Sequence, residues 1–132
     1  MLYAGTSSTL VLRPLNTAVV QGSAVTLQCS SDNSSAILLW YNSTCLTLTN
    51  NDTSQCINDL VYSGHRVTDK FPPGFHVTAE NNGTHVTRDL NINSTQLTDA
   101  GVYLCAETGP GAPILDLSSA QLIVLGNLYS LI

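Results

Sequence analysis

The stretch Asp99-Ala100-Gly101-Val102-Tyr103-Leu104-Cys105 decides the fold of this 132-residue chain. It ends in a cysteine that stands two positions after a tyrosine, and upstream of it Cys29 is followed eleven positions later by Trp40. This spacing is typical of two antiparallel sheets that face each other, with one cross-link and one indole filling the space between them. The chain is therefore predicted to be an all-β, two-sheet sandwich.

Short segments of alternating apolar and polar residues cover most of the chain, with clusters of Asn, Gly, Ser and Pro between them. Such alternation is the pattern of half-buried strands, and no segment has helical periodicity. We expect Pro14 to break an edge strand that changes sheets, and Asn81-Asn82-Gly83 to form a tight hairpin turn. The expected strands cover residues 9–13, 18–20, 25–29, 37–41, 75–79, 85–92, 102–107 and 117–125.

From about Thr9 to Leu125 the chain resembles the variable-type (V-set) domains of the immunoglobulin superfamily, because it carries the cysteine, tryptophan and tyrosine motifs quoted above. The resemblance implies a disulfide between Cys29 and Cys105. Such a bond would close a loop of roughly 75 residues and contribute about 4–5 kcal/mol in the chain-entropy model. We accordingly expect residues 1–8 to be a flexible N-terminal segment, 9–125 the V-type domain and 126–132 a tail or linker.

The resemblance also assigns roles around the disulfide. Trp40 packs on it, and Tyr103 is the corner tyrosine, whose hydroxyl bonds to the backbone near Leu97 or Asp99. The stretch between Trp40 and Phe75 is longer than a constant-type domain needs, so we expect an extra hairpin. Its strands, C′ and C″, are expected at residues 46–48 and 60–62.

Several features of the family are missing from this sequence. Gly74 stands near the slot of the arginine that usually pairs with the corner aspartate, so Arg66, Lys70 or Arg88 takes over that role or Asp99 only caps the turn. The glutamine that follows the tryptophan in antigen receptors and their Phe-Gly-x-Gly bulge are both absent. We therefore expect a single-gene cell-surface recognition molecule, and not a rearranging antigen receptor.

The cysteines and glycosylation sequons indicate the secretory route. Four cysteines without CxxC spacing fit disulfides better than a zinc site. With Cys29 and Cys105 joined, Cys45 and Cys56 remain, either as a local brace or as an intermolecular bridge. Asn-x-Ser/Thr sequons stand at Asn33, Asn42, Asn51, Asn82 and Asn93. The sequence shows no signal peptide and no run of 18 apolar residues, so an anchor is expected outside it.

Composition and motifs argue against several classes of function. Only 10% of the residues are charged and the net charge is −5, so there is no basic surface for nucleic acid or an anionic membrane. The three histidines, His65, His76 and His85, lack metal-ligand spacing, and no nucleophile elbow or carboxylate pair occurs. We expect no enzyme activity and no cofactor.

Function is therefore expected to come from the surface. By the resemblance, the outward face of strands G, F, C and C′ is the favoured protein-binding face, either for a separate ligand or for a second copy of the chain. We expect the following residues to bind the partner: Leu39, Tyr41, Leu104 and Glu107, with Gly109, Pro110 and Gly111 of the loop between strands F and G. Ala106, Leu46 or Leu48, and Leu115 or Leu117 are expected to extend this face, with Asp116 beside it.

Two alternatives remain at this point. One is a soluble or viral decoy of the same fold. The other is a glycan or microbial-surface binder that uses the loop from Gly109 to Pro113.

Overall fold

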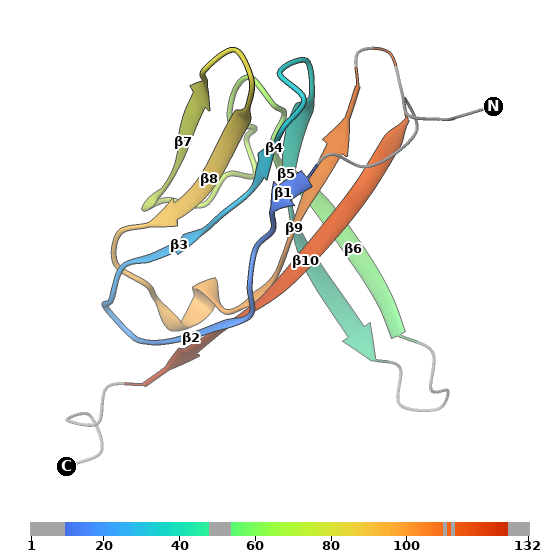
Figure 1. Cartoon of the computed structure of the whole chain (residues 1–132). Helices are drawn as coiled ribbons and strands as arrows, with labels where there is room; N and C mark the ends of the chain where they lie inside the picture. Colours follow the sequence, from blue (N-terminus) through green and yellow to red (C-terminus); the bar gives the residue numbers. More distant parts are fainter. Residues whose placement is uncertain (1–9, 48–53, 110, 112, 127–132) are drawn as a thin grey trace.

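Two sheets packed face to face make up the fold, and their strand pairs are antiparallel except for β2 with β10 (Figure 1). The computed structural model describes residues 10–47, 54–109, 111 and 113–126, with no side-chain description for residues 45–47 and 54–55. The first sheet contains β1 (Leu10–Leu12), β4 (Ser30–Ser31), β8 (Val86–Ile92), β3 (Val25–Leu27) and β7 (Phe75–Asn81). The second contains, in order, β2 (Thr17–Val20), β10 (Ile114–Leu125), β9 (Gly101–Thr108), β5 (Ile37–Thr47) and β6 (Ser54–Tyr62). The all-β sandwich prediction is confirmed.

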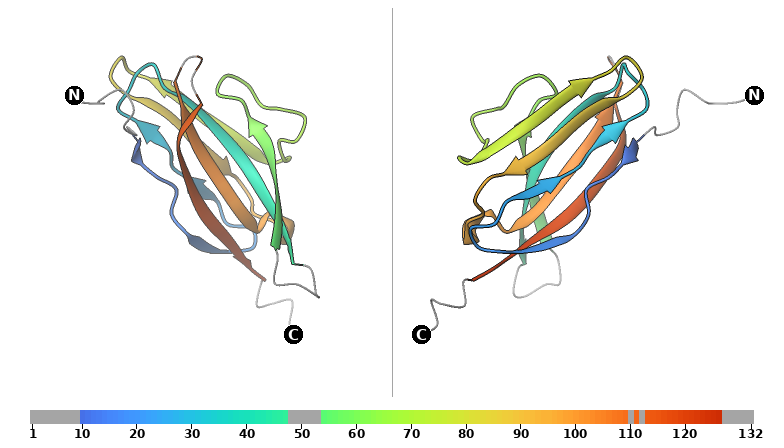
Figure 2. Two further views of the ribbon diagram at one scale, coloured as in Figure 1. Left: turned by 90° about the vertical axis from the view of Figure 1, so that its right-hand side faces the viewer. Right: turned by 60° about the vertical axis from the view of Figure 1, so that its left-hand side comes forward.

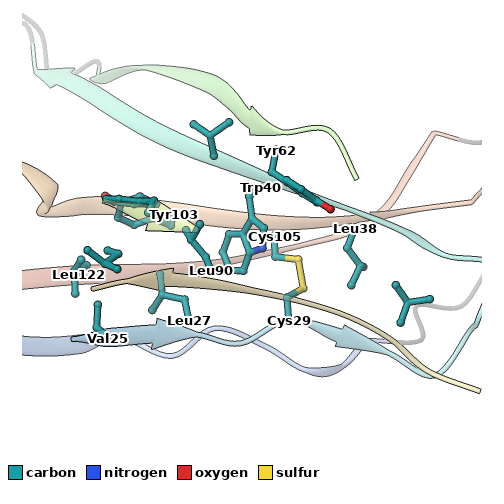
Figure 3. Packing of buried hydrophobic residues seen from close by; sticks show 14 residues of the cluster. Val25, Leu27, Cys29, Leu38, Trp40, Tyr62, Leu90, Tyr103, Cys105 and Leu122 are labelled. Carbon is teal, nitrogen blue, oxygen red and sulfur yellow. A yellow bond between two sulfur atoms is a disulfide. The ribbon is translucent and has the colours of Figure 1, made fainter. Parts of the chain in front are cut away.

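The sheets are joined through their centre by a disulfide between Cys29 and Cys105 (Figure 3). Trp40 is completely buried beside it, and its indole N–H donates to the backbone oxygen of Arg88 at 2.7 Å. Alternate residues of β5, β8 and β9 turn inward, so that burial follows the predicted period of two. The core cluster contains Val25, Leu27, Leu38, Val61, Tyr62, Phe75, Val86, Leu90, Ile92, Tyr103 and Leu122 around this bond.

The N-terminal strand changes sheets as predicted. β1 pairs with β4 in the first sheet, whereas β2 runs parallel to β10 in the second. Pro14, which cannot donate a backbone hydrogen bond, lies between the two halves. The two views in Figure 2 show the N-terminal part of the chain, drawn in blue, crossing from one layer to the other.

The turn before β9 is a single 3₁₀ turn, η2 (Leu97–Asp99). The Asp99 carboxylate accepts the backbone N–H of Gln96 at 2.8 Å, so the aspartate caps this turn. The Tyr103 hydroxyl donates to the backbone oxygen of Asp99, as expected for a corner tyrosine. Burial, with a smaller effect from the Asp99 carboxylate, raises the pKa of Tyr103. Arg88 does not pair with Asp99, because its guanidinium donates to the backbone oxygens of Gly64, Glu80 and Thr87.

The prediction of a separate C′–C″ hairpin at 46–48 and 60–62 is wrong. Leu46 and Thr47 continue β5, which is a single strand of 11 residues, and residues 60–62 end the strand β6 that pairs with it. β6 is therefore C′, and Leu48 lies outside the described residues. Between Tyr62 and Phe75, the described chain forms one isolated bridge, Tyr62 to Val67, and no strand C″. The ribbon of β5 and β6 extends past the rest of the sandwich (Figure 1).

The corner hydrogen bond gives a first prediction. Tyr103→Phe leaves the Asp99 carbonyl without its hydroxyl partner, so the free energy of unfolding should fall by about 1–2 kcal/mol. Tyr41→Phe is the matched control, since Tyr41 is half-buried on the outside of the sheet, and we expect a change within about 0.5 kcal/mol. Urea unfolding of both variants measures the difference. Equal losses would show that the corner bond contributes nothing specific.

Candidate protein-binding face

The outer face of the second sheet consists of side chains that alternate with the buried ones. We define the outer face by ten residues: Leu39, Tyr41, Ser43, Leu60, Val102, Leu104, Ala106, Leu117, Ser119 and Gln121. Strand register arranges most of them in rungs across β5, β9 and β10: Leu39–Ala106–Leu117, Tyr41–Leu104–Ser119 and Ser43–Val102–Gln121. β10, β9, β5 and β6 stand where the family has strands G, F, C and C′.

The outer face is largely apolar and contains no charged residue. Leu117 is 47% exposed, and Leu39, Tyr41 and Leu104 are half-buried. Ala106 lies on the same face but is completely covered by its neighbours. It therefore supplies a flat floor between larger side chains, and does not reach solvent.

The apolar surface continues to the far end of β10. Leu122 is buried and Val124 packs on the core, so the alternating Ile123 and Leu125 project outward, where they are 44% and 51% exposed. Val20 of β2 pairs with Leu125 and is 49% exposed. Sequence reasoning did not assign these residues to the face, although the alternation of β10 already indicated it.

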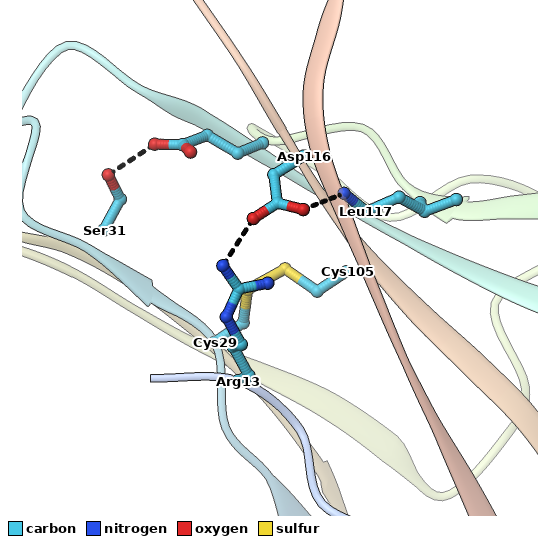
Figure 4. A network of polar contacts seen from close by, with 7 residues as sticks. Arg13, Cys29, Ser31, Cys105, Asp116 and Leu117 are labelled. Carbon is cyan, nitrogen blue, oxygen red and sulfur yellow. Dashed lines mark hydrogen bonds and ion pairs between the residues drawn. A yellow bond between two sulfur atoms is a disulfide. The ribbon is translucent and has the colours of Figure 1, made fainter. Parts of the chain in front are cut away.

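The prediction that Glu107 contacts a partner is wrong, because its side chain is completely buried. Tyr103, Cys105 and Glu107 alternate along β9 and all turn inward. The Ser31 hydroxyl of the first sheet donates to Glu107 Oε2 at 2.7 Å (Figure 4). A buried carboxylate needs such partners, since its desolvation is costly. Glu107 therefore connects the two sheets.

Asp116 also connects parts of the sandwich. Its carboxylate forms an ion pair with Arg13 at 2.5 Å and accepts the backbone N–H of Leu117 at 2.8 Å (Figure 4). Its side chain is 21% exposed. The acidic group predicted to flank the face is thus engaged with the N-terminal segment.

The loop between β9 and β10 is described only in part. Gly109 is half-buried, and Gly111 is exposed with a φ of +66° that favours glycine. Pro110 lies outside the described residues. The loop's role in binding remains a prediction.

The ribbon of β5 and β6 contains the second cysteine pair. β5 pairs with β9 only as far as Ser43, whereas its pairing with β6 continues to Thr47. Cys45 and Cys56 are direct register partners in this outer part, and Cys56 is disulfide-bonded. This register favours a local brace over an intermolecular bridge.

The sequons are distributed away from the outer face. Asn33 is half-buried and Asn82 and Asn93 are exposed, and these three lie in turns beside the first sheet. Asn42 follows Tyr41 in mid-strand, so its side chain projects to the opposite side. There it lines a hollow of about 350 Å³ with Thr44, Thr98 and Gly101. Asn51 lies outside the described residues. Three of the four described sequons therefore lie outside the outer face, whereas the hollow beside Asn42 is also lined by Ser43 and Val102 of that face.

The described residues contain no group of three or more His, Cys, Asp or Glu side chains arranged to hold a metal ion. His76 and His85 lie on β7 and in the turn before β8, and His65 lies in the segment after β6. Within the same part of the chain, no helix has the length and apolarity needed to cross a membrane.

Comparison with known proteins agrees with this architecture. The family model of the immunoglobulin V-set domain matches residues 13–125. The chain belongs to the immunoglobulin V-set family. V-set domains are generally recognition modules without enzyme activity, and one with an intrachain disulfide is typically extracellular. A search of curated proteins finds no match to the V-set chain.

Two solved structures have the same fold at low sequence identity. One comes from a study of the multimeric cell-adhesive interactions of VGSC beta subunits, with a TM-score of 0.53 and 14% identity over 95% of this chain and 97% of that chain. The other is Dpr2 Ig1-Ig2 in complex with DIP-Theta Ig1-Ig3, with a TM-score of 0.60 and 18% identity over 89% of this chain and 34% of that chain. These likenesses establish the fold of the V-set chain, and not its partner.

The position of Cys45 and Cys56 gives a second prediction. For a loop of this length the chain-entropy model assigns a disulfide about 3 kcal/mol. In the double variant Cys45→Ser/Cys56→Ser the free energy of unfolding should fall by much less than that, because the outer ribbon can open locally while the sandwich stays folded. The rate of backbone hydrogen exchange should rise in β5 after Ser43 and in β6 before Asn58, and it should stay unchanged in β9. The control variant, Cys29→Ala/Cys105→Ala, should lose about 4–5 kcal/mol.

Non-reduced peptide mapping tests the pairing itself. It should recover Cys45 and Cys56 in one cross-linked fragment pair from a single chain. A covalent dimer on a non-reducing gel that disappears in Cys45→Ser/Cys56→Ser would instead support an intermolecular bridge.

Proposed function

We propose that this V-set domain is the extracellular recognition domain of a membrane-anchored adhesion or immune-type receptor, and that it binds a protein through the outer face. The observation that carries the proposal is a flat sheet surface with aromatic and aliphatic side chains and no charge. Exposed apolar surface of this kind marks protein interfaces, whose centres are depleted in charged residues and enriched in aromatic ones.

The rigidity of the surface supports the same function. The central rungs lie directly over Trp40 and Cys105, which alternate with Leu39, Tyr41 and Leu104 on the same strands. A preorganised surface loses little conformational entropy when it binds. Tyr41 and Leu104, which are cross-strand partners, are therefore the proposed energetic centre.

The two acidic residues of β9 and β10 also support this choice, because each carboxylate already has a partner within the chain. Glu107 and Asp116, the carboxylates nearest to the upper rungs on β9 and β10, are engaged inside the sandwich or with Arg13. A partner can therefore cover Leu39 and Leu117 without desolvating an unpaired carboxylate there, which would oppose binding.

The sequons and the structural neighbours also fit the proposal. Glycans at Asn33, Asn82 and Asn93 would cover the side of the first sheet and leave the second sheet for a partner. The neighbours described above take part in cell-adhesive interactions or in a complex of immunoglobulin domains. An adhesion-type role is favoured over a glycan binder, because the described side chains of the two upper rungs, Leu39–Ala106–Leu117 and Tyr41–Leu104–Ser119, are mostly aliphatic or aromatic.

Charged substitutions in the central rung test the proposal. Tyr41→Asp and Leu104→Glu should each weaken binding by about thirtyfold or more, since hot-spot residues contribute about 2 kcal/mol or more. The ligand is first identified by screening the glycosylated domain against displayed extracellular domains, and surface plasmon resonance then measures each variant. Thermal unfolding verifies that both variants fold.

Val67→Asp is the matched control, because Val67 is 49% exposed and lies outside the outer face. Its binding should equal that of the unchanged chain. If instead the ligand binds both face variants normally and loses affinity when Gly109 or Gly111 is changed, the loop between β9 and β10 is the binding surface and the proposal is wrong.

A further inference from the structure

The edge of the second sheet at β6 is unusually open for a strand of its length. β6 has 9 residues, whereas the edge strands β1, β2 and β7 have 3, 4 and 7. Native proteins protect sheet edges with short strands, prolines, lysines, bulges or a covering segment, because an open edge is a template for another strand. β6 contains no proline, lysine or arginine, and its single charged residue is Asp59.

The covering segment reaches only one end of this edge. Thr68 donates its N–H to the backbone oxygen of Val61 and its hydroxyl to that of Leu60, and Tyr62 bridges to Val67. Among the described residues, no strand lies on the outer side of β6 next to Gln55–Asp59. Ile57, at the centre of this part, is 59% exposed. No glycosylation sequon falls within β6.

We propose that this edge pairs antiparallel with the same edge of a second copy of the chain, about a two-fold axis at Ile57. Antiparallel pairing lets one segment serve as its own complement. Each Ile57 then faces its counterpart, and the exposed aliphatic side chain becomes covered.

The charge distribution permits this register, and the exposed Ile57 at its centre favours it. With the axis at Ile57, Asp59 stands opposite Gln55 of the other copy, and the two Asp59 positions are four residues apart along the strand, about 14 Å. That separation exceeds the Debye length of about 8 Å at physiological salt. An axis at Asp59 would put the two carboxylates directly opposite each other, which is destabilising. The segment is therefore complementary in register to a second copy of itself.

The geometry gives the dimer a consequence for recognition. The two-fold axis of an antiparallel strand pair is perpendicular to the sheet, so the two second sheets join into one and their outer faces lie on the same side. Two binding faces presented together can engage two partners on one opposing surface, which raises avidity without any new contact. The dimer contact is separate from the outer face, so either can fail without the other.

The test measures self-association of the glycosylated chain by analytical ultracentrifugation. The unchanged chain should dimerise. Ile57→Lys and Ile57→Glu should each weaken the dimer by about fivefold at low salt, because like charges then face each other across the pair. An equimolar mixture of the two variants should regain dimer, as a heterodimer, because the facing charges are now opposite. Ile57 is exposed, so both variants should retain the thermal unfolding temperature of the unchanged chain.

Two controls separate this contact from the proposed binding face. Val67→Lys introduces a charge at another exposed apolar residue near β6 and should leave the dimer intact. Tyr41→Asp should also leave it intact. The proposal is overturned by a monomeric unchanged chain at the highest concentration reached, by a dimer that survives both Ile57 variants, by a mixture that stays monomeric, or by loss of the dimer in Tyr41→Asp.

Discussion

The bond between Cys29 and Cys105, packed against Trp40, is the constraint on which the rest of the molecule depends. It holds the two backbones at a Cα–Cα distance of 6.5 Å, and it joins β9, in the middle of the second sheet, to the segment between β3 and β4 in the first. Trp40 adds a polar connection in the same place, since its N–H reaches the Arg88 carbonyl on β8. The indole can therefore be fully buried without leaving its donor unpaired. The strands that carry the outer face are thus the ones most firmly fixed.

Several of the charged side chains in this chain fasten the structure. Glu107 is bonded to Ser31, Asp116 to Arg13, and Asp99 to its own turn. Asp89 is half-buried and accepts the Cys29 N–H, and its pKa is raised because burial outweighs that hydrogen bond. With few charged residues in total, such use leaves the outer face neutral. The apolar surface is therefore a consequence of where the carboxylates are needed.

The centre of the fold could be predicted from the sequence because it depends on local spacing. The cysteine, tryptophan and tyrosine positions are each set by strand alternation over a few residues, and the structure confirms the disulfide, the buried Trp40 and the corner Tyr103. The inward position of Glu107 was equally available from the alternation of β9. It was missed because a glutamate was assumed to be exposed, whereas burial of a polar group depends on a distant partner, Ser31.

The ribbon could not be predicted in the same way, because it depends on register. The side-chain pattern of Leu46 and Thr47 fits a continuation of β5 and a separate strand equally well. Only their pairing with residues of β6 shows that they continue β5. Once β5 is continuous, no strand from the described chain covers the outer part of β6. Ile57, which lies between the two strands expected at residues 46–48 and 60–62, is then part of an exposed edge.

The outer face and the open edge of β6 belong to the same sheet, but they point in different directions. Side chains of the outer face project perpendicular to the sheet, whereas the hydrogen-bonding groups of an edge strand lie in its plane. Contacts made through Tyr41 and Leu104 therefore do not compete for space with contacts made along β6. The two proposed contacts can therefore form at once, because the core fixed by the disulfide carries the first surface and the projecting ribbon carries the second.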